Sequence, residues 1–524
     1  MSQQPSPSPS TAPVPAAAAG VAGAMAVAVS LSVSELVGAL TGPGPSLVSA
    51  IGSHVVDLGA ARFKNLAVSL FGTNDKPALL VGIVVLSLAV GAWLGLASRR
   101  RPQAGTVGIG AFALLGFAAA ATSPQGSPIA AALAAAGGWV GGTLVLRWLL
   151  RLAAATRFDA GPSAGSRSGT LRQQRRRLLT AAAGSGLVSV LALAVSRQLR
   201  AGQTVDVARE AVVLPTPSAT VSVPPQPFAV PDLGPYVTPN AEFYRIDTAL
   251  VTPEVDVAGW TLTVKGMVSR PFTLTYAELL AMPMVERVVT LSCVSNEVGG
   301  DLVGNARWLG VPLSAVLDRA GVSPDATQLV GRSVDRFTVG MPTATVTDGR
   351  TALVAVGMNG VPLPSAHGFP ARLVVAGLYG YVSATKWLAE LELTRLEAFD
   401  AYWIDRGWAK QAPVKTQSRI DVPLLGSAVK AGQVMIAGVA WAPSRGISSV
   451  EVQVDDGPWQ RAELGRVASS DTWVQWVLPW RADPGVHRLQ VRATDGTGAV
   501  QDAAVRPPEP DGATGYHQRQ ISVT

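Results

Sequence analysis

Cysteine is almost absent from this chain, because only one of its 524 residues, Cys293, is a cysteine. A single thiol excludes a disulfide within the chain and leaves no set of cysteines for an iron–sulfur cluster. Such a residue is either a small core side chain or a thiolate that is kept for chemistry. Composition alone does not choose between the two.

Charge and histidine are also scarce. Charged residues make up 15% of the chain against 48% hydrophobic residues, and there are four histidines. Only His54 precedes residue 200, so a haem held by two histidines is not expected in the apolar first part. The net charge of +7 does not indicate nucleic-acid binding, since many arginines flank apolar stretches, as at Arg99–Arg101 and Arg172–Arg177.

The apolar excess is concentrated before residue 200. A Pro/Ser-rich tail without charge, residues 1–15, is expected to be disordered. The stretches that follow are long enough to cross roughly 30 Å of hydrocarbon as helices, and many of their residues are small enough for close helix packing. We therefore predict a transmembrane helical domain at 16–198 with about five spans, at 16–40, 77–97, 105–122, 127–150 and 178–197.

Residues 45–70 do not fit the same pattern, because polar side chains interrupt them: Ser53, His54, Asp57, Arg62, Lys64 and Asn65. We interpret this segment as an interfacial or re-entrant excursion, with a sixth span as the alternative. Its charges at Asp57, Arg62 and Lys64 could mark a contact with a quinone or a partner protein. A loop on the outer face also explains these charges and avoids the free-energy cost of burying them in the membrane, so it is the preferred interpretation.

The arginines predict an orientation. Arg99–Arg101 follow one span, and a second cluster fills the loop before the last span, at Arg147, Arg151, Arg157, Arg167, Arg172 and Arg175–Arg177. With both clusters in the cytoplasm, the chain is a multi-pass protein of the cell membrane whose part after residue 198 is extracytoplasmic. Arg175–Arg177 also resemble an internal twin-arginine export signal, and a simple positive-inside anchor is the alternative.

Beyond the membrane part the sequence predicts three segments. Residues 199–235 contain seven prolines between 215 and 235 and are expected to form a semi-extended linker. Residues 236–412 mix strand and helix patterns, which indicates an α+β domain. After residue 413 short alternating strands and turn signals predict an all-β sandwich with a tail, up to residue 524.

Cys293 lies in the middle of the α+β segment. The apolar run Val288–Leu291 leads to the cysteine, and a polar loop with Asn296, Gly299 and Gly300 follows it. A strand that ends in such a loop presents a functional group at its tip.

Residues 236–510 carry five motifs in order: Asn240-Ala-Glu-Phe243-Tyr244, the Cys293 loop, Asn305-Ala-Arg307-Trp308, His367-Gly-Phe-Pro-Ala-Arg372, and Gly377-Leu-Tyr-Gly380 followed by Lys386-Trp387. In this order they resemble the molybdopterin-dependent oxidoreductases related to sulfite oxidase. The resemblance implies a sulfite-oxidase-type α+β molybdopterin domain, followed by a C-terminal immunoglobulin-like dimerisation domain. Together with the apolar part, the expected fold is an N-terminal α-helical membrane bundle followed by these two domains.

The resemblance also assigns roles to residues. In that family the matching cysteine is a metal ligand, which makes Cys293 the expected thiolate ligand of molybdenum, a role that suits a soft donor. Asn240, Phe243 and Tyr244 would line the pterin, and His367 and Arg372 would hold the pterin and its phosphate. The remaining cofactor-binding candidates are Tyr381, Val382, Ser383, Lys386 and Asp335, of which Asp335 could also be a plain turn residue.

The substrate side departs from the sulfite oxidases. Pro239 and Glu297 stand where those enzymes carry arginines, and Trp408 replaces an active-site tyrosine. Arg445 and Arg307 are the candidate catalytic arginines, with an exposed loop charge as the alternative for Arg445. Because an ionised Glu297 would repel sulfite, the sequence supports oxygen-atom transfer at molybdenum without specifying sulfite.

The expected protein is thus a molybdenum-dependent oxidoreductase, anchored in membrane lipid, that acts on a small, sulfur-containing substrate. It would exchange electrons with a separate carrier, either a quinone or a cytochrome, and neither a haem nor an iron–sulfur cluster is expected in the chain. The resemblance leaves room for a homodimer. Two alternatives stay open: a reductase of oxidised sulfur such as a sulfoxide, and a non-catalytic membrane protein whose sandwich mediates assembly.

Overall fold

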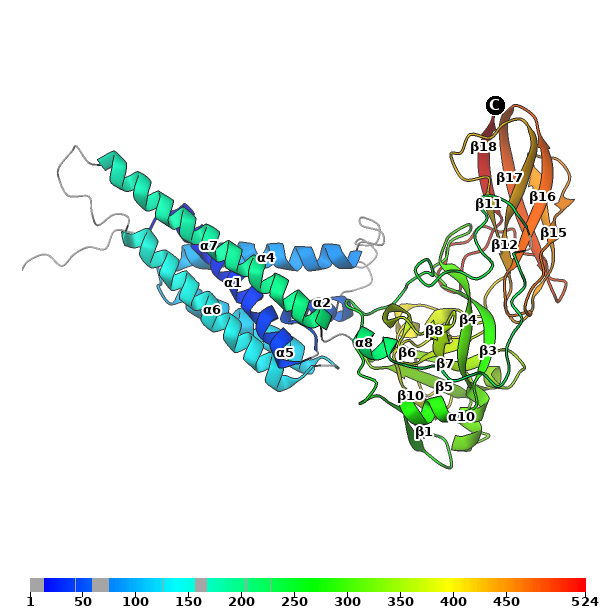
Figure 1. The fold of residues 1–524 in the computed structure, drawn as a ribbon, viewed down its shortest axis with the longest axis horizontal. Coiled ribbons are helices and arrows are strands. Elements are labelled where there is room, and N and C mark those ends of the chain that lie inside the picture. The colour runs from blue at the N-terminus through cyan, green and yellow to red at the C-terminus, as the bar shows by residue number, and fades with distance from the viewer. Residues whose placement is uncertain are drawn as a thin grey trace, which may run out of the picture. The chain divides into compact units, whose positions relative to one another are not determined.

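A computed structural model describes residues 14–42, 44–58, 75–124, 126–155, 167–202, 205–226 and 228–524. The chain divides into two compact units (Figure 1). The first is helical and comprises Met1–Thr204 with Ala249–Glu254, and the second is rich in strands and comprises Val205–Thr248 with Val255–Thr524. The predicted disordered tail lies almost wholly outside the described residues.

The first unit is a bundle of helices: α1 (Ala16–Thr41), α2 (Leu47–Leu58), α4 (Asp75–Ala97), α5 (Ala104–Thr122), α6 (Pro128–Ala155) and α7 (Arg167–Gly202). Within the described residues, five helices are long and apolar enough to cross a membrane, and they coincide with the five predicted stretches. The prediction of five apolar helices is therefore confirmed.

Small residues let these helices approach closely. On α4, Gly91 and Gly95 lie against Ala19 and Gly23 of α1, where an added Cβ would collide with the facing backbone. The outward faces are apolar as well, with Leu86 and other large side chains exposed. A helix that is apolar on both its inner and its outer face suits a membrane better than water.

Of the segment 45–70, the structure describes residues 45–58, and Leu47–Leu58 form helix α2. Helix α2 has 12 residues and is about 18 Å long, which is short of the roughly 30 Å that a span must cross. His54 of this helix contacts the hydroxyl of Thr122 on α5, with a distance of 3.2 Å from Nε2 to Oγ1. The side chains of Asp57, Arg62, Lys64 and Asn65 lie outside the described residues, as do those of Arg157, Arg167, Arg172 and Arg175.

The second unit begins with a short helix, α8 (Val205–Glu210), and an extended segment. The predicted linker, 199–235, is therefore helical at its start, in the end of α7 and in α8, and extended after residue 211, where its described residues pack onto the unit. Ser218 donates its backbone N–H to the carbonyl of Met284, and Leu233 packs with Ala437 and Val477. The segment therefore runs along both domains of the second unit.

The α+β domain has two five-stranded sheets. One has the order β2-β1-β10-β5-β6, and the other is β3-β4-β7-β8 with β9 paired to β7. Helix α9 begins at a capping box in which Thr275 and Glu278 satisfy each other's backbone N–H groups. The bounds are β1 (Thr261–Gly266), β2 (Phe272–Thr275), α9 (Tyr276–Ala281), β3 (Val285–Ser292), β4 (Val303–Pro312), α10 (Leu313–Ala320), β5 (Gln328–Ser333), β6 (Thr338–Pro342), β7 (Ala352–Met358), β8 (Val361–Pro362), β9 (Arg372–Val375), α11 (Gly380–Ser383) and β10 (Leu388–Thr394), with short 3₁₀ turns at Thr343–Val346, Ser365–His367 and Ile404–Arg406.

The C-terminal domain consists of two four-stranded antiparallel sheets, ordered β11-β12-β16-β15 and β14-β13-β17-β18. Side chains of both sheets share one core, in which Ile436 and Trp476 of the first sheet meet Val450 and Leu489 of the second. The immunoglobulin-like topology of this sandwich stays a prediction. The strands are β11 (Gln417–Val422), β12 (Gly432–Trp441), β13 (Ile447–Val454), β14 (Gln460–Arg461), β15 (Glu463–Leu464), β16 (Val474–Ala482), β17 (Gly485–Asp495) and β18 (His517–Val523).

Candidate functional site

Cys293 is the first residue after β3, and its side chain is almost fully buried, at 8% exposure. The loop that it opens is closed on itself by hydrogen bonds. Cys293 donates its N–H to the carbonyl of Leu302 at 2.9 Å, and Leu302 donates its own N–H to Oδ1 of the buried Asn296 at 2.8 Å. The thiol therefore sits at the tip of a buried strand, on a loop with little freedom.

The segment Tyr236–Asn240 is held beside this sheet by three polar side chains. Asn305 of β4 donates from Nδ2 to the carbonyl of Tyr236 at 2.9 Å. Asn359, in the turn between β7 and β8, donates from Nδ2 to Oδ1 of Asn240 at 2.7 Å, and His367 Nε2 lies 3.0 Å from the carbonyl of Asn240. Asn359 belongs to none of the sequence motifs, because nothing local marks a partner 119 residues away.

Phe243 and Tyr244 follow directly and stack on each other, with ring centroids 5.2 Å apart. Phe243 is buried and meets the ring of His367 edge-on at 5.6 Å. The pKa of Tyr244 lies far above its usual value because of burial and the nearby charge of Cys293, which Arg372 partly offsets. Tyr244 packs, partly buried, against the core that contains Leu291, two residues before the thiol, and Arg372 lies over the ring of Trp308 in that core at 5.0 Å, so the structure brings these predicted residues into one region.

The most unusual feature of this region is a group of three buried basic side chains. Arg372, His367 and Lys386 are exposed by only 5%, 6% and 9%. Arg372 donates from Nη1 to the carbonyl of His367 at 3.0 Å, and Lys386 donates from Nζ to a carboxylate oxygen of Asp247 at 2.7 Å. Within the described part of the chain, no carboxylate forms an ion pair with Arg372.

Burial lowers the pKa of all three basic groups. The pKa of His367 falls to about 4, because of burial and then repulsion from Arg372. The pKa of Lys386 falls to about 8, since burial outweighs the attraction of Asp247, and that of Arg372 falls to about 10. At neutral pH His367 is therefore uncharged, whereas Arg372 and Lys386 are buried cations, which are costly unless an anion compensates them. A phosphate group fits such a set of donors.

The remaining predicted cofactor residues lie in a turn after β5 and in helix α11. Asp335 accepts from the backbone N–H of Phe337 at 3.0 Å, as a turn residue does, and Val334 donates to the carbonyl of Trp387, next to Lys386. Helix α11 contains three buried residues, Tyr381, Val382 and Ser383. The ring of Tyr381 packs against Trp408 at 5.7 Å between centroids.

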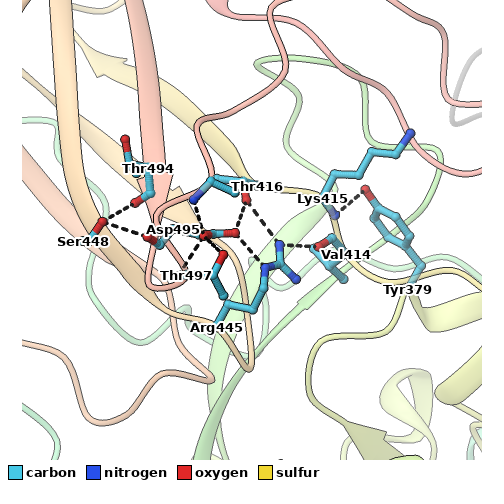
Figure 2. A network of polar contacts seen from close by, with 10 residues as sticks. Tyr379, Val414, Lys415, Thr416, Arg445, Ser448, Thr494, Asp495 and Thr497 are labelled. Carbon is cyan, nitrogen blue, oxygen red and sulfur yellow. Dashed lines mark hydrogen bonds and ion pairs between the residues drawn. The ribbon is translucent and has the colours of Figure 1, made fainter.

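Arg445 is engaged in a polar network of the C-terminal domain (Figure 2). Its Nε lies 2.8 Å from Oδ2 of Asp495, and its Nη2 donates to the carbonyl of Val414 at 3.0 Å. Burial alone would raise the pKa of Asp495, but hydrogen bonds from Thr497, Arg445 and Ala499 outweigh it and hold that pKa well below its usual value. Arg445 thereby ties the sandwich to the segment that joins the two domains.

Sequence reasoning missed Tyr379 as a site residue; it is buried and lies against Gly512 of the C-terminal domain. Its pKa rises to about 12, chiefly through burial, and the charges of Asp511, Cys293 and Arg445 also act on it. Its hydroxyl accepts weakly from the backbone N–H of Lys415, at 3.4 Å. It was visible in the sequence only as part of the motif Gly377-Leu-Tyr-Gly380.

Arg307 is not brought to Cys293. It pairs on β4 with Val288 of β3, five residues before the cysteine, which corresponds to about 16 Å along a strand. Its Nη1 lies 3.7 Å from Glu286. Arg307 instead lines a cavity of about 440 Å³ together with Val223, Val237, Pro239, Asn240, Asn359 and Val361. Glu297, by contrast, is exposed on the loop of Cys293.

The α+β domain thus combines a buried thiol at the end of a strand with buried basic side chains whose donors suit an anionic group. A family model described as "Oxidoreductase molybdopterin binding domain" matches residues 249–403. The chain is 31% identical over 176 residues to the "Uncharacterized oxidoreductase YuiH" of Bacillus subtilis (strain 168), covering 33% of this chain and 85% of that protein. The chain belongs to the molybdopterin-binding oxidoreductases of the sulfite oxidase family.

Other likenesses cover a larger share of the chain. The mitochondrial sulfite oxidase of Homo sapiens is 30% identical over 321 residues, which cover 52% of this chain and 58% of that protein. The chain therefore spans less than two thirds of that relative. Among solved structures, the sulfane dehydrogenase SoxCD from Paracoccus pantotrophus is similar with a TM-score of 0.49 and 24% identity, over 55% of this chain and 82% of that one.

Proposed function

We propose that this protein is a membrane-anchored molybdenum-dependent oxidoreductase that transfers an oxygen atom to or from a small, sulfur-containing substrate on the extracytoplasmic side. The observation that carries the proposal is one shared core, in which Leu291, two residues before Cys293, packs with Phe243 and Trp308, and Arg372 lies over the ring of Trp308 at 5.0 Å. The thiol and the arginine that would hold the cofactor are thus carried by the same packed group of residues.

The residues of the site fit a molybdenum–molybdopterin cofactor. Cys293 would supply the thiolate ligand, a soft donor that suits this metal. Arg372 and Lys386 would hold the phosphate through charge-assisted hydrogen bonds, whereas His367, which is uncharged at neutral pH and contacts the carbonyl of Asn240, would line the pterin. When bound, the cofactor supplies two-electron redox chemistry and exchange of an oxygen atom. The pterin would be lined by Asn240, Phe243, Tyr244 and the buried residues of α11.

Metal analysis of the full chain tests this assignment. We expect about one molybdenum per chain in the wild type, and we expect Cys293→Ser to abolish turnover and alter the visible absorption of the bound cofactor while leaving the protein folded. Ser295→Ala, which changes an exposed neighbour on the same loop, is the matched control. A wild-type protein without metal or pterin, indistinguishable from Cys293→Ser, would contradict the proposal.

The membrane topology is a second part of the proposal. The arginines at Arg99–Arg101 and Arg176–Arg177 flank apolar helices, which supports a cytoplasmic location for both clusters. Because the chain has a single cysteine, a Cys293→Ser background allows labelling at chosen sites. We expect an impermeant maleimide to label Val505→Cys in intact cells and Arg100→Cys only after lysis. The reverse pattern would contradict the orientation.

A reductase of oxidised sulfur, such as a sulfoxide, is the second candidate. Two cations near Tyr379 are already paired with carboxylates, Arg445 with Asp495 and Lys415 with Asp511. Cations that are already paired with carboxylates attract a charged sulfite only weakly, so a neutral substrate is favoured more than it would be by unpaired arginines. Steady-state assays of sulfite oxidation and sulfoxide reduction on the same preparation distinguish the two directions.

A further inference from the structure

The loop of Cys293 is in contact with two strands of the C-terminal sandwich. Its residues Gly299 and Gly300 meet His517 at the start of β18 and Arg419 in β11. These two strands belong to different sheets of the sandwich. The backbone N–H of Ile420 donates to Nδ1 of His517 at 3.0 Å, so the two strands are joined at the point where they reach the loop.

Gly299 lies directly against the imidazole of His517. An added Cβ at this position would collide with Cδ2 and Nε2 of the ring. The residue also has a φ of +79°, a left-handed conformation that favours glycine. The contact between the Cys293 loop and the imidazole of His517 therefore requires glycine at position 299. This contact sets how close the loop can lie to β18.

Arg419 holds the next residue by a hydrogen bond. Its Nη1 donates to the carbonyl of Gly300 at 2.8 Å, while its Nε lies 2.6 Å from Oδ1 of Asp421. The carboxylate orients the guanidinium, so little side-chain freedom is lost when it binds the loop. From the inner side, Asn296 accepts from Leu302 and closes the same loop.

We infer that the sandwich positions the cysteine of the other domain, and that His517 and Arg419 are positioning residues that act through Gly299 and Gly300. The inference rests on the proposed role of Cys293 as the metal ligand. The sandwich then contributes to the active site without touching the substrate: it limits the movement of the loop on which the thiolate is carried.

Hydrogen exchange of the full chain in detergent tests the inference directly. In Arg419→Met we expect the amides of residues 293–302 to exchange roughly tenfold faster, because a charge-assisted hydrogen bond to the loop is lost. His517→Asn keeps an acceptor for Ile420 but loses the ring, whereas His517→Phe keeps a ring and loses the acceptor. We expect faster exchange in both. Arg488→Met, which removes an ion pair with Asp456 elsewhere on the sandwich, is the matched control.

Two further readouts separate positioning from general stability. In the holoenzyme we expect Arg419→Met to shift the visible absorption and to lower kcat roughly tenfold with KM within about twofold, whereas Arg419→Lys recovers part of the loss. Unchanged exchange of residues 293–302 in the folded variants would overturn the inference. Because hydrogen exchange needs no metal, this result, which contradicts the positioning role, can be told apart from the absence of molybdenum in the wild type, which contradicts the proposed function. If Arg419→Met does not fold, exchange of residues 293–302 in the two His517 variants and in Arg419→Lys tests the inference in the same way.

Discussion

The ammonium nitrogen of Lys386 lies 2.7 Å from a carboxylate oxygen of Asp247, although 139 residues separate them in the chain. Both side chains are nearly inaccessible, at 10% and 3% exposure. Even with this partner the pKa of Lys386 falls to about 8, because burial dominates and because Arg372 and Arg245 repel the charge. The pair therefore belongs to a cluster that still has an excess of positive charge.

This lowered pKa predicts a pH dependence. An unfolded lysine keeps its proton up to about 10.5, whereas folded Lys386 loses it near 8, so the unfolded state binds more protons in between. The stability of the cofactor-free protein should rise with pH across this window, by roughly 3 kcal/mol at most. Lys386→Met should remove the rise, and Lys265→Met, at a more exposed ion pair with Glu390, should not. Thermal unfolding at several pH values measures the difference.

His367 predicts an acid sensitivity. Its pKa of about 4 in the folded protein means that the unfolded state takes up a proton first as the pH falls below 6.5. Stability should therefore decrease between about pH 6.5 and 4, and His367→Asn should flatten this part of the profile. His487 provides a control of opposite sign, because Asp455 raises its pKa and stabilises its charged form. A steeper acid loss in His367→Asn would contradict the prediction.

Asn359 should be important for keeping the segment Tyr236–Asn240 in place. Its side chain forms three hydrogen bonds, with Arg307, Thr238 and Asn240. In Asn359→Gly the glycine tolerates the φ of 52°, but all three hydrogen bonds are lost. This loss should lower the free energy of unfolding by about 3 kcal/mol and reduce the amount of cofactor retained on purification. Asp232→Gly, also at positive φ but on an exposed turn, should be nearly neutral. Unfolding temperature and molybdenum content are the measurements.

In the helical unit, Gly95 should be intolerant of any side chain. Gly95→Val would drive its Cβ into the carbonyl of Ala19 and separate α1 from α4. On the same helix, a Cβ added at Gly82 would meet no other atom within 4 Å, so Gly82→Val is the control. We expect Gly95→Val alone to aggregate at lower temperature in detergent. Equal thermal stability of the two variants would show that this close packing contributes little.

The sequence by itself determined the features that depend on short windows. Apolar runs of about 20 residues predict the five long helices, and the run before Cys293 predicts the strand that carries it. The capping residues of α9 lie within three positions of each other. The motifs, each confined to a few residues, were enough to indicate the family.

Only the tertiary structure decided which distant residues meet. It placed Asp247 beside Lys386, engaged Arg445 with Asp495, and set Arg307 several residues along the sheet from Cys293. Local propensity has no information about such pairs, because they form only when segments far apart in the chain pack together. For the same reason Cys293 could be recognised from its motif, whereas its support by a second domain is visible only in the folded chain.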